Sequence, residues 1–108
     1  MKNGLIIVND TKFWYQEDKL HRVDGPAIEY SDGASKWFLD GLLHREDGPA
    51  IEYPNGHKEW WLNGKLHRED SHSIEWSYGD KSWFYKGKEL EVSSQKEFER
   101  LINLKLFW

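Results

Sequence analysis

The residues best suited to chemistry form a His-Arg-x-Asp cluster that occurs three times in the chain. It reads "LHRVDGPAIEY" at 20–30, "LHREDGPAIEY" at 43–53 and "LHREDSHSIEW" at 66–76. An imidazole near a carboxylate can act as a general acid or base, and imidazoles also bind metal ions. A catalytic site needs only one such cluster, so the repetition itself requires an explanation.

The spacing of the three histidines argues against one shared metal ion. His21, His44 and His67 are 23 residues apart. If each unit contributes two strands, equivalent residues lie about 10 Å apart, because strands pack about 4.8 Å apart. Nitrogens bound to one zinc ion each lie about 2 Å from it. We therefore expect no metal and no cofactor, and a metal held by His67 and His72 is only a remote alternative.

A catalytic role for the His-Asp pair is equally weakly supported. No Ser or Cys recurs beside it to act as a nucleophile. We expect each Arg to pair with the Asp of its own loop and each His to donate to a backbone carbonyl. The residues that we assign to this structural role are His21, Asp24, His44, Asp47, His67 and Asp70. The chain is predicted not to be an enzyme, and a hydrolase using His67, Asp70 and His72 is the least favoured function.

The same period of 23 residues organises most of the chain. It relates Trp14, Trp37, Trp60 and Trp83 to one another. Each unit holds two Asp-Gly or Asn-Gly pairs, which are typical of tight hairpin turns because they adopt positive φ angles. The runs between them are rich in Ile, Tyr, Trp, Phe and Leu and favour strands. The sequence predicts an all-β antiparallel β-hairpin repeat meander of about seven to eight strands over residues 5–90.

The C-terminal segment has a different pattern. In "VSSQKEFERLINLKLFW", a Ser-x-x-Glu capping box begins at Ser94, and the apolar residues after it fall on one helical stripe. These apolar residues are Phe98, Leu101 and Ile102. We predict a helix over 94–105 that caps the last repeat and is followed by apolar residues at 106–108. The whole chain, 1–108, is expected to form a single domain.

The repeat resembles the MORN repeat, a 23-residue β-hairpin unit. The resemblance rests on "EWWLNGKLH" at 59–67 and on the later Asn55-Gly56 pair. The chain departs from the family by having His-Arg-Glu-Asp-Gly-Pro-Ala in place of His-Gly-x-Gly, and two residues between Trp60 and Asn63. It is closer to variant HRxDGPA units of uncharacterised phage and giant-virus proteins, which also resemble "SSQKEFERL". The resemblance implies non-catalytic roles in protein association and scaffolding, with lipid-headgroup binding proposed for some members.

Aromatic residues are predicted on both faces of the sheet. The residue after each repeated Trp is also aromatic, and neighbouring residues of a strand point to opposite faces. This second ladder consists of Tyr15, Phe38, Trp61 and Phe84. One ladder should pack as core with a row of Ile28, Ile51 and Ile74, whereas the other needs a cover. A helix of about 11 residues spans roughly 16 Å, which is about half of a sheet roughly 35 Å wide. Sheet curvature, a second copy or a partner must cover the remainder.

Composition narrows the classes of partner. The 108 residues carry a formal net charge of −4 with no basic run, so nucleic acid is not expected. The chain has no cysteine for a disulfide, and its longest aliphatic run, 5–8, is too short to cross a membrane. We expect no membrane association and a cytoplasmic location, which would be the host cytoplasm for a phage-encoded protein.

The preferred function is a non-catalytic protein-binding module, such as a phage-encoded inhibitor or adaptor acting on a host defence protein. Its partner would be a protein, with a homo-oligomer also considered. The alternative is a nucleotide or lipid-headgroup receptor in which Trp61 or Trp76 stacks on a ring and Arg45 or Arg68 holds a phosphate. The candidate binding residues are Tyr15, Phe38, Trp61, Phe84, Arg45, Arg68, His72 and Trp76.

The third copy of the cluster loses the Gly-Pro-Ala of the other two and gains His72 and Trp76. Two explanations remain. Either this loop is released from the repeat pattern because the C-terminal helix packs there, or it is where the protein contacts another molecule. We favour packing.

Overall fold

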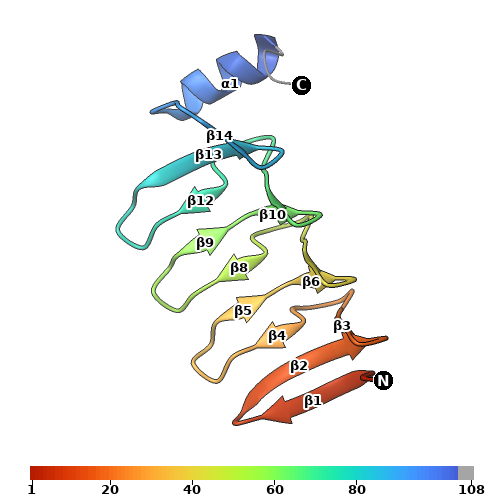
Figure 1. Cartoon of the computed structure of the whole chain (residues 1–108). Coiled ribbons are helices and arrows are strands. Elements are labelled where there is room, and N and C mark those ends of the chain that lie inside the picture. Colours follow the sequence, from red (N-terminus) through yellow and green to blue (C-terminus); the bar gives the residue numbers. More distant parts are fainter. Residues whose placement is uncertain (105–108) are drawn as a thin grey trace.

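The protein forms an open, antiparallel sheet of stacked hairpins with one C-terminal helix (Figure 1). A computed structural model describes residues 1–104. The predicted fold class, an antiparallel hairpin meander with a C-terminal helix, is confirmed. The described chain is long and thin, with principal extents of 46 × 29 × 18 Å.

The strands follow one another along the chain in repeating groups. They are β1 (Gly4–Val8), β2 (Thr11–Gln16), β3 (Lys19–Leu20), β4 (Ile28–Glu29), β5 (Ser35–Lys36), β6 (Phe38–Leu39), β7 (Leu42–Leu43), β8 (Ile51–Glu52), β9 (Lys58–Glu59), β10 (Trp61–Leu62), β11 (Lys65–Leu66), β12 (Ile74–Glu75), β13 (Lys81–Tyr85) and β14 (Lys88–Leu90). The main sheet runs β1-β2-β4-β5-β8-β9-β12-β13-β14, with β3 attached to β2. Two small sheets, β6-β7 and β10-β11, stand beside it.

The described chain has more and shorter strands than the seven to eight expected, because the strand that carries each inner Trp changes partner at that residue. Before Trp37, β5 pairs with β4 and β8; after it, β6 pairs with β7. The Trp37 N–H donates to the Ala50 carbonyl, and the Trp37 carbonyl accepts from the His44 N–H. Each of the two inner units therefore contributes to the main sheet and to a separate hairpin.

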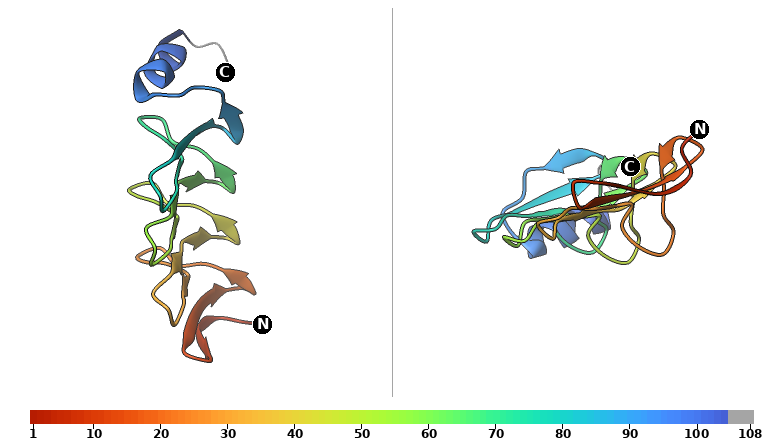
Figure 2. Two further views of the ribbon diagram at one scale, coloured as in Figure 1. Left: turned by 90° about the vertical axis from the view of Figure 1, so that its left-hand side faces the viewer. Right: turned by 90° about the horizontal axis from the view of Figure 1, so that it is seen from below.

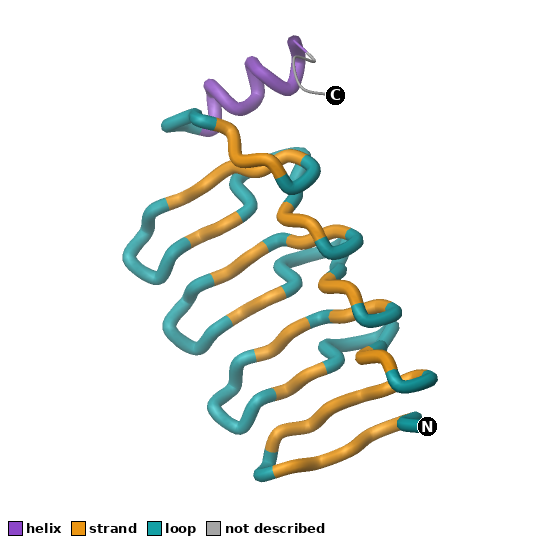
Figure 3. The backbone as a smooth tube through the Cα atoms, in the orientation of Figure 1, coloured by secondary structure: helices purple, strands orange, loops and turns teal. Residues whose placement is uncertain are grey.

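Both predicted kinds of turn are present and recur in register along the stack (Figure 3). Asp40 and Gly41 have φ angles of 50° and 81°, as a two-residue type I′ turn requires. The other turn spans residues 30–33 and is closed by the hydrogen bond from the Gly33 N–H to the Tyr30 carbonyl. Gly33, its last residue, has a φ of 98°. The dipeptides that signalled hairpins in the sequence thus form them.

The isoleucine row lies on the face of the second aromatic ladder, not on that of the tryptophans. Phe13 is directly opposite Ile28, and residues opposite each other in an antiparallel pair share a face. The Phe13 and Tyr15 rings stack on that face at 6.4 Å. On the other face, Arg22 contacts both Trp14 and Glu29. Ile28, like its counterparts Ile51 and Ile74 in the next units, is buried and forms part of the core.

Helix α1 (Gln95–Leu104) covers the C-terminal end of the stack. Phe98 is fully buried against Trp83 and Leu90, and Ile102 packs on the same cluster. The Ser94 hydroxyl accepts a hydrogen bond from the Glu97 N–H, as the capping box predicts. Predicted positions 105–108 lie outside the described residues.

The helix does not shield half of a sheet face, as its length had suggested. It lies beyond β14 at the end of the stack (Figures 1 and 2). The reason is that Phe98 packs on the last strands, where the next repeat would otherwise stack. Both sheet faces of the preceding units are therefore left to their own side chains.

Candidate functional site

An arginine in each His-Arg-x-Asp loop stacks on the tryptophan of its own unit. The Arg45 guanidinium carbon lies 4.0 Å from the centre of the Trp37 ring. Its Nε donates to Asp47 at 2.9 Å, and its Nη1 donates to the Pro49 carbonyl at 3.1 Å and to Glu52 at 3.3 Å. The equivalent Arg22 and Arg68 stack on Trp14 and Trp60 at 3.8 and 4.1 Å. The expected pairing of each Arg with the Asp of its loop is confirmed.

This arrangement also controls the charge of Asp47. The hydrogen bond from Arg45, reinforced by its positive charge, lowers the pKa of the Asp47 carboxyl below its ordinary value. Asp47 is therefore ionised near neutral pH, and its side chain is 81% exposed. The loop presents a fixed negative charge next to a cation that is already paired.

The repeated histidines act as acceptors, so the expectation that they donate to backbone carbonyls is wrong. His44 Nδ1 accepts from the Asn63 backbone N–H at 3.0 Å, and His67 Nδ1 accepts from the Lys86 N–H at 2.8 Å. His21 makes the same bond to Asp40. The partner lies 19 residues ahead, in the type I′ turn of the next unit, where an N–H has no strand partner. Each histidine therefore joins its loop to the following hairpin.

Two grooves lie between successive loops on the tryptophan face. The first, of about 480 Å³, has Trp37 and Leu39 on its floor, between the loop of Arg22 and that of Arg45. The second, of about 670 Å³, has Trp60 and Leu62 in the same places. Adding 23 to each residue number of the first groove gives residues of the second. The grooves are thus one site built twice, and Arg45, a predicted binding residue, lines both.

The rims of both grooves are acidic. The carboxylates along them have side chains between 74% and 88% exposed. They are Asp24, Glu46, Asp47, Glu69 and Asp70. The arginines in the same loops are largely covered by tryptophan and by carboxylates. A molecule approaching the grooves therefore meets negative charge above an aromatic and aliphatic floor.

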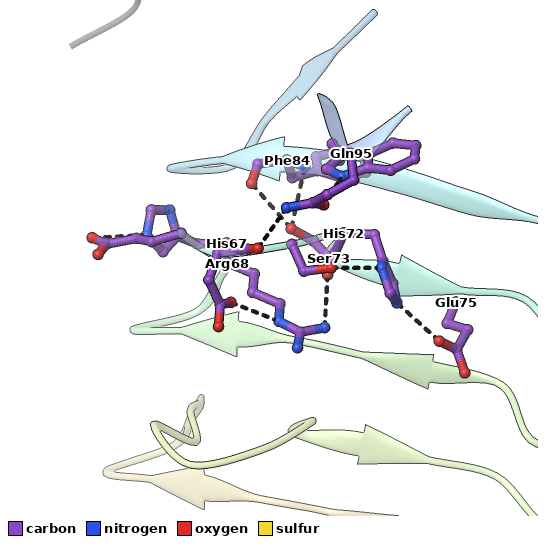
Figure 4. A network of polar contacts seen from close by, with 11 residues as sticks. His67, Arg68, His72, Ser73, Glu75, Phe84 and Gln95 are labelled. Atoms are coloured by element: carbon purple, nitrogen blue, oxygen red, sulfur yellow. Dashed lines mark hydrogen bonds and ion pairs between the residues drawn. The ribbon is translucent and has the colours of Figure 1, made fainter. Parts of the chain in front are cut away.

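The divergent third loop is connected to the helix (Figure 4). Gln95, the first residue of α1, donates to the Asp70 carbonyl at 2.7 Å and accepts from the Trp83 indole at 3.1 Å. Ser73, in place of alanine, is completely buried and its hydroxyl bonds both backbone groups of Phe84. These contacts agree with the explanation that the third loop diverges because the C-terminal helix packs there.

His72 occupies the repeat position of Pro26 and Pro49. It binds the glutamate that pairs with the arginine in the other two loops. Its Nε2 lies 2.9 Å from Glu75, the counterpart of the glutamates that bind Arg22 and Arg45. Arg68 keeps its bond to the carbonyl of residue 72, at 3.3 Å. The centre of the His72 ring also lies 5.4 and 6.2 Å from the centres of the Trp60 and Trp83 rings. The sequence singled out His72 for binding, and the structure places it in a packed network.

Acidification should weaken the fold through His72. Burial lowers its pKa below the ordinary 6.5, and Arg68 and Lys81 lower it further, against an opposing effect of Glu75. The unfolded chain therefore binds more protons, and stability falls as the pH drops below about 6.5 toward the lowered pKa. We expect urea unfolding to show a larger loss between about pH 7.5 and pH 5 for the wild type than for His72→Gln. Equal losses would show that His72 is not the group responsible.

The second ladder, predicted to bind, is partly covered. Tyr15, Phe38, Trp61 and Phe84 are all half-buried. The Trp61 indole donates to Glu59 at 2.8 Å, and the other oxygen of Glu59 lies 2.7 Å from His57. Sequence reasoning missed His57, because it occupies the position of a buried alanine in the preceding unit and carries no repeat signal.

Trp76, the last predicted binding residue, belongs to an aromatic group at the outer turns. The centre of its ring lies 4.8 Å from the centre of the His57 ring, and it stacks with Tyr78 at 6.2 Å between ring centres. Tyr78 is 72% exposed. The structure therefore does not bring the predicted binding residues into one site: Arg45 and Arg68 line the grooves, whereas Trp76 and the second ladder lie elsewhere.

Within residues 1–104, no group of three or more His, Asp or Glu side chains is arranged to hold a metal ion. In the same part of the chain, no helix has the length and apolar character needed to cross a membrane. Comparisons with family models, curated proteins and solved structures found no match.

Proposed function

We propose that the chain is a non-catalytic module that binds a protein partner along the ridge of His-Arg-x-Asp loops. The observation that carries the proposal is the duplication of one groove at an offset of 23 residues. A site repeated along a stack suits an extended ligand that repeats with it, whereas a reaction needs one set of reacting groups.

Charge indicates the kind of partner. The exposed rim carboxylates favour cationic side chains, and the Trp37 and Trp60 floors favour their aliphatic stems. Successive units lie about 9.6 Å apart if strands are about 4.8 Å apart. A polyproline II helix rises about 9.3 Å in three residues. We therefore propose an extended partner segment with a lysine or arginine at every third position.

The arrangement disfavours the small-ligand alternative at Arg45 and Arg68. The Nε and Nη1 atoms of Arg45 already donate to Asp47, Pro49 and Glu52. A phosphate at this position would also face the exposed carboxylates of the rims. The kinship with MORN-like repeats and an origin in a phage are proposals that rest on the sequence resemblance.

The direct test is fluorescence anisotropy with two labelled peptides of equal composition, (Lys-Pro-Pro)4 and its isomer with the four lysines in one block. We expect the evenly spaced peptide to bind more tightly. We expect the double variant Glu46→Lys/Glu69→Lys to lose about tenfold or more in affinity, because it replaces attraction by repulsion in both grooves.

The matched control is Glu91→Lys/Glu99→Lys, which changes the net charge equally at exposed positions that do not line either groove. This control should bind nearly as well as the wild type at moderate salt. Absence of binding by both peptides, or equal weakening by the two double variants, would refute the proposed ridge.

A further inference from the structure

The N-terminal edge of the main sheet is bare. Within the described chain, β1 pairs only with β2, so its second edge has no strand beside it. Leu5, Ile7 and Val8 are 48%, 58% and 52% exposed, although the strand is wholly uncharged. An exposed, apolar edge of this kind pairs readily with another strand.

The backbone groups that face outward can be identified from the ladder. Asn9 and Asp10, at φ angles of 50° and 63°, form a two-residue turn, so Val8 and Thr11 are a hydrogen-bonded pair. Alternation along the ladder then directs the Ile6 groups toward β2. The N–H and C=O groups of Leu5 and Ile7 point away from β2, toward the open edge.

The two ends of the stack differ in how the edge of the sheet is protected. At the C-terminal end, α1 packs against β13 and β14, and Phe98 closes the last cluster. Strand β14 also carries Lys88 and Glu89. Proteins commonly protect an edge with charges, proline, a bulge or a covering helix. Strand β1 contains no charge or proline and is fully paired with β2 without a bulge.

We propose that this edge binds the same edge of a second copy, so that two β1 strands pair antiparallel about a twofold axis at Ile6. In this register Leu5 is opposite Ile7 of the second copy, and Ile7 is opposite its Leu5. The outward groups of both residues then form four hydrogen bonds. The two Ile6 side chains meet on one face, and the Leu5 and Ile7 side chains of both copies meet on the other.

Charge complementarity supports the register. The nearest charged residues before and after β1 are Lys2 and Asp10, both exposed. Pairing about Ile6 places Lys2 of one copy nearest Asp10 of the other, twice. The Lys2 ammonium at present lies 5.0 Å from the centre of its own Tyr15 ring, and its backbone N–H donates to Asp18. Its side chain can therefore turn toward Asp10 without disturbing the strand.

The consequence goes beyond the proposed binding role. Two ten-stranded sheets would join into one continuous sheet. The twofold axis would then relate the ridges of His-Arg-x-Asp loops of the two copies. Because the contact is one short strand pair, we expect a dimer that dissociates at low concentration.

Sedimentation velocity over a range of concentrations, up to about 1 mM, tests the inference. We expect the wild type to pass from monomer to dimer. The variant Leu5→Lys/Ile7→Lys places like charges opposite each other twice and should raise the dissociation constant at least about tenfold. The matched variant Leu5→Lys/Ile7→Glu loses the same apolar side chains but places opposite charges across the axis, so it should dimerise more tightly than the double lysine.

A single proline substitution gives an independent readout. Ile7→Pro removes only an outward N–H and should prevent dimerisation while leaving the far-ultraviolet circular dichroism unchanged. A wild type that stays monomeric throughout would overturn the proposal. Equal dimerisation of the wild type and the double-lysine variant would do so too, because the dimer would then use another surface.

Discussion

Replacing Phe98 with alanine should lower the free energy of unfolding by about 3 to 5 kcal/mol. Phe98 is fully buried, and it joins α1 to Trp83 and Leu90 at the end of the stack. Its removal leaves a cavity that a terminal helix cannot fill, and it exposes the last repeat. The measurement is equilibrium denaturation in urea, followed by tryptophan fluorescence.

The adjacent Glu99 provides the control, since it is exposed on the same helix. Glu99→Ala should change stability by no more than about 0.5 kcal/mol. Because the repeats contact mainly their neighbours, Phe98→Ala should also accelerate amide exchange in β13 and β14 before β1 and β2. A loss below about 1 kcal/mol would mean that the helix does not cap the stack.

Replacing Arg45 with alanine should cost about 2 to 3 kcal/mol, which is the second largest effect that we expect. The side chain is 21% exposed and combines ring stacking on Trp37 with bonds to Asp47, Pro49 and Glu52. Its loss would uncover the indole and leave the Glu52 carboxylate without this cation.

Arg45→Lys separates geometry from charge. Lysine keeps the positive charge but lacks the planar fork that stacks and donates in several directions, so it should recover less than half of the loss. Arg100→Ala, at an exposed helix position, is the control and should be nearly neutral. Full recovery by lysine in urea denaturation would contradict the stacking interpretation.

The local fold followed directly from sequence. Asp40-Gly41 and Asn63-Gly64 form the type I′ turns that such pairs favour, and Ser94 caps the helix. These features were predictable because each depends on the conformational preferences of two to four adjacent residues. The period of 23 added the stacking order, because identical units bury the same face against one another.

The site was predictable only in part. The pairing of Arg45 with Asp47 followed from their spacing within one loop. The stacking of Arg45 on Trp37 and the histidine bond to the turn 19 residues ahead did not, since both depend on how a loop folds back on another strand. We expected each histidine to donate to a backbone carbonyl, but its partner is a backbone N–H of a tight turn. A backbone group of this kind leaves no pattern in the sequence.

By itself, then, the sequence determined the repeat, its turns and the capping helix, because local preferences repeated at a fixed period leave few alternative folds. Tertiary structure decided which surfaces remain available. It bent each inner strand at Trp37 and Trp60, stacked one arginine on each of those rings and opened two grooves between the loops. It also placed α1 at one end and left β1 bare at the other. Exposure depends on contacts between residues far apart in the chain, and only the assembled sheet specifies those contacts.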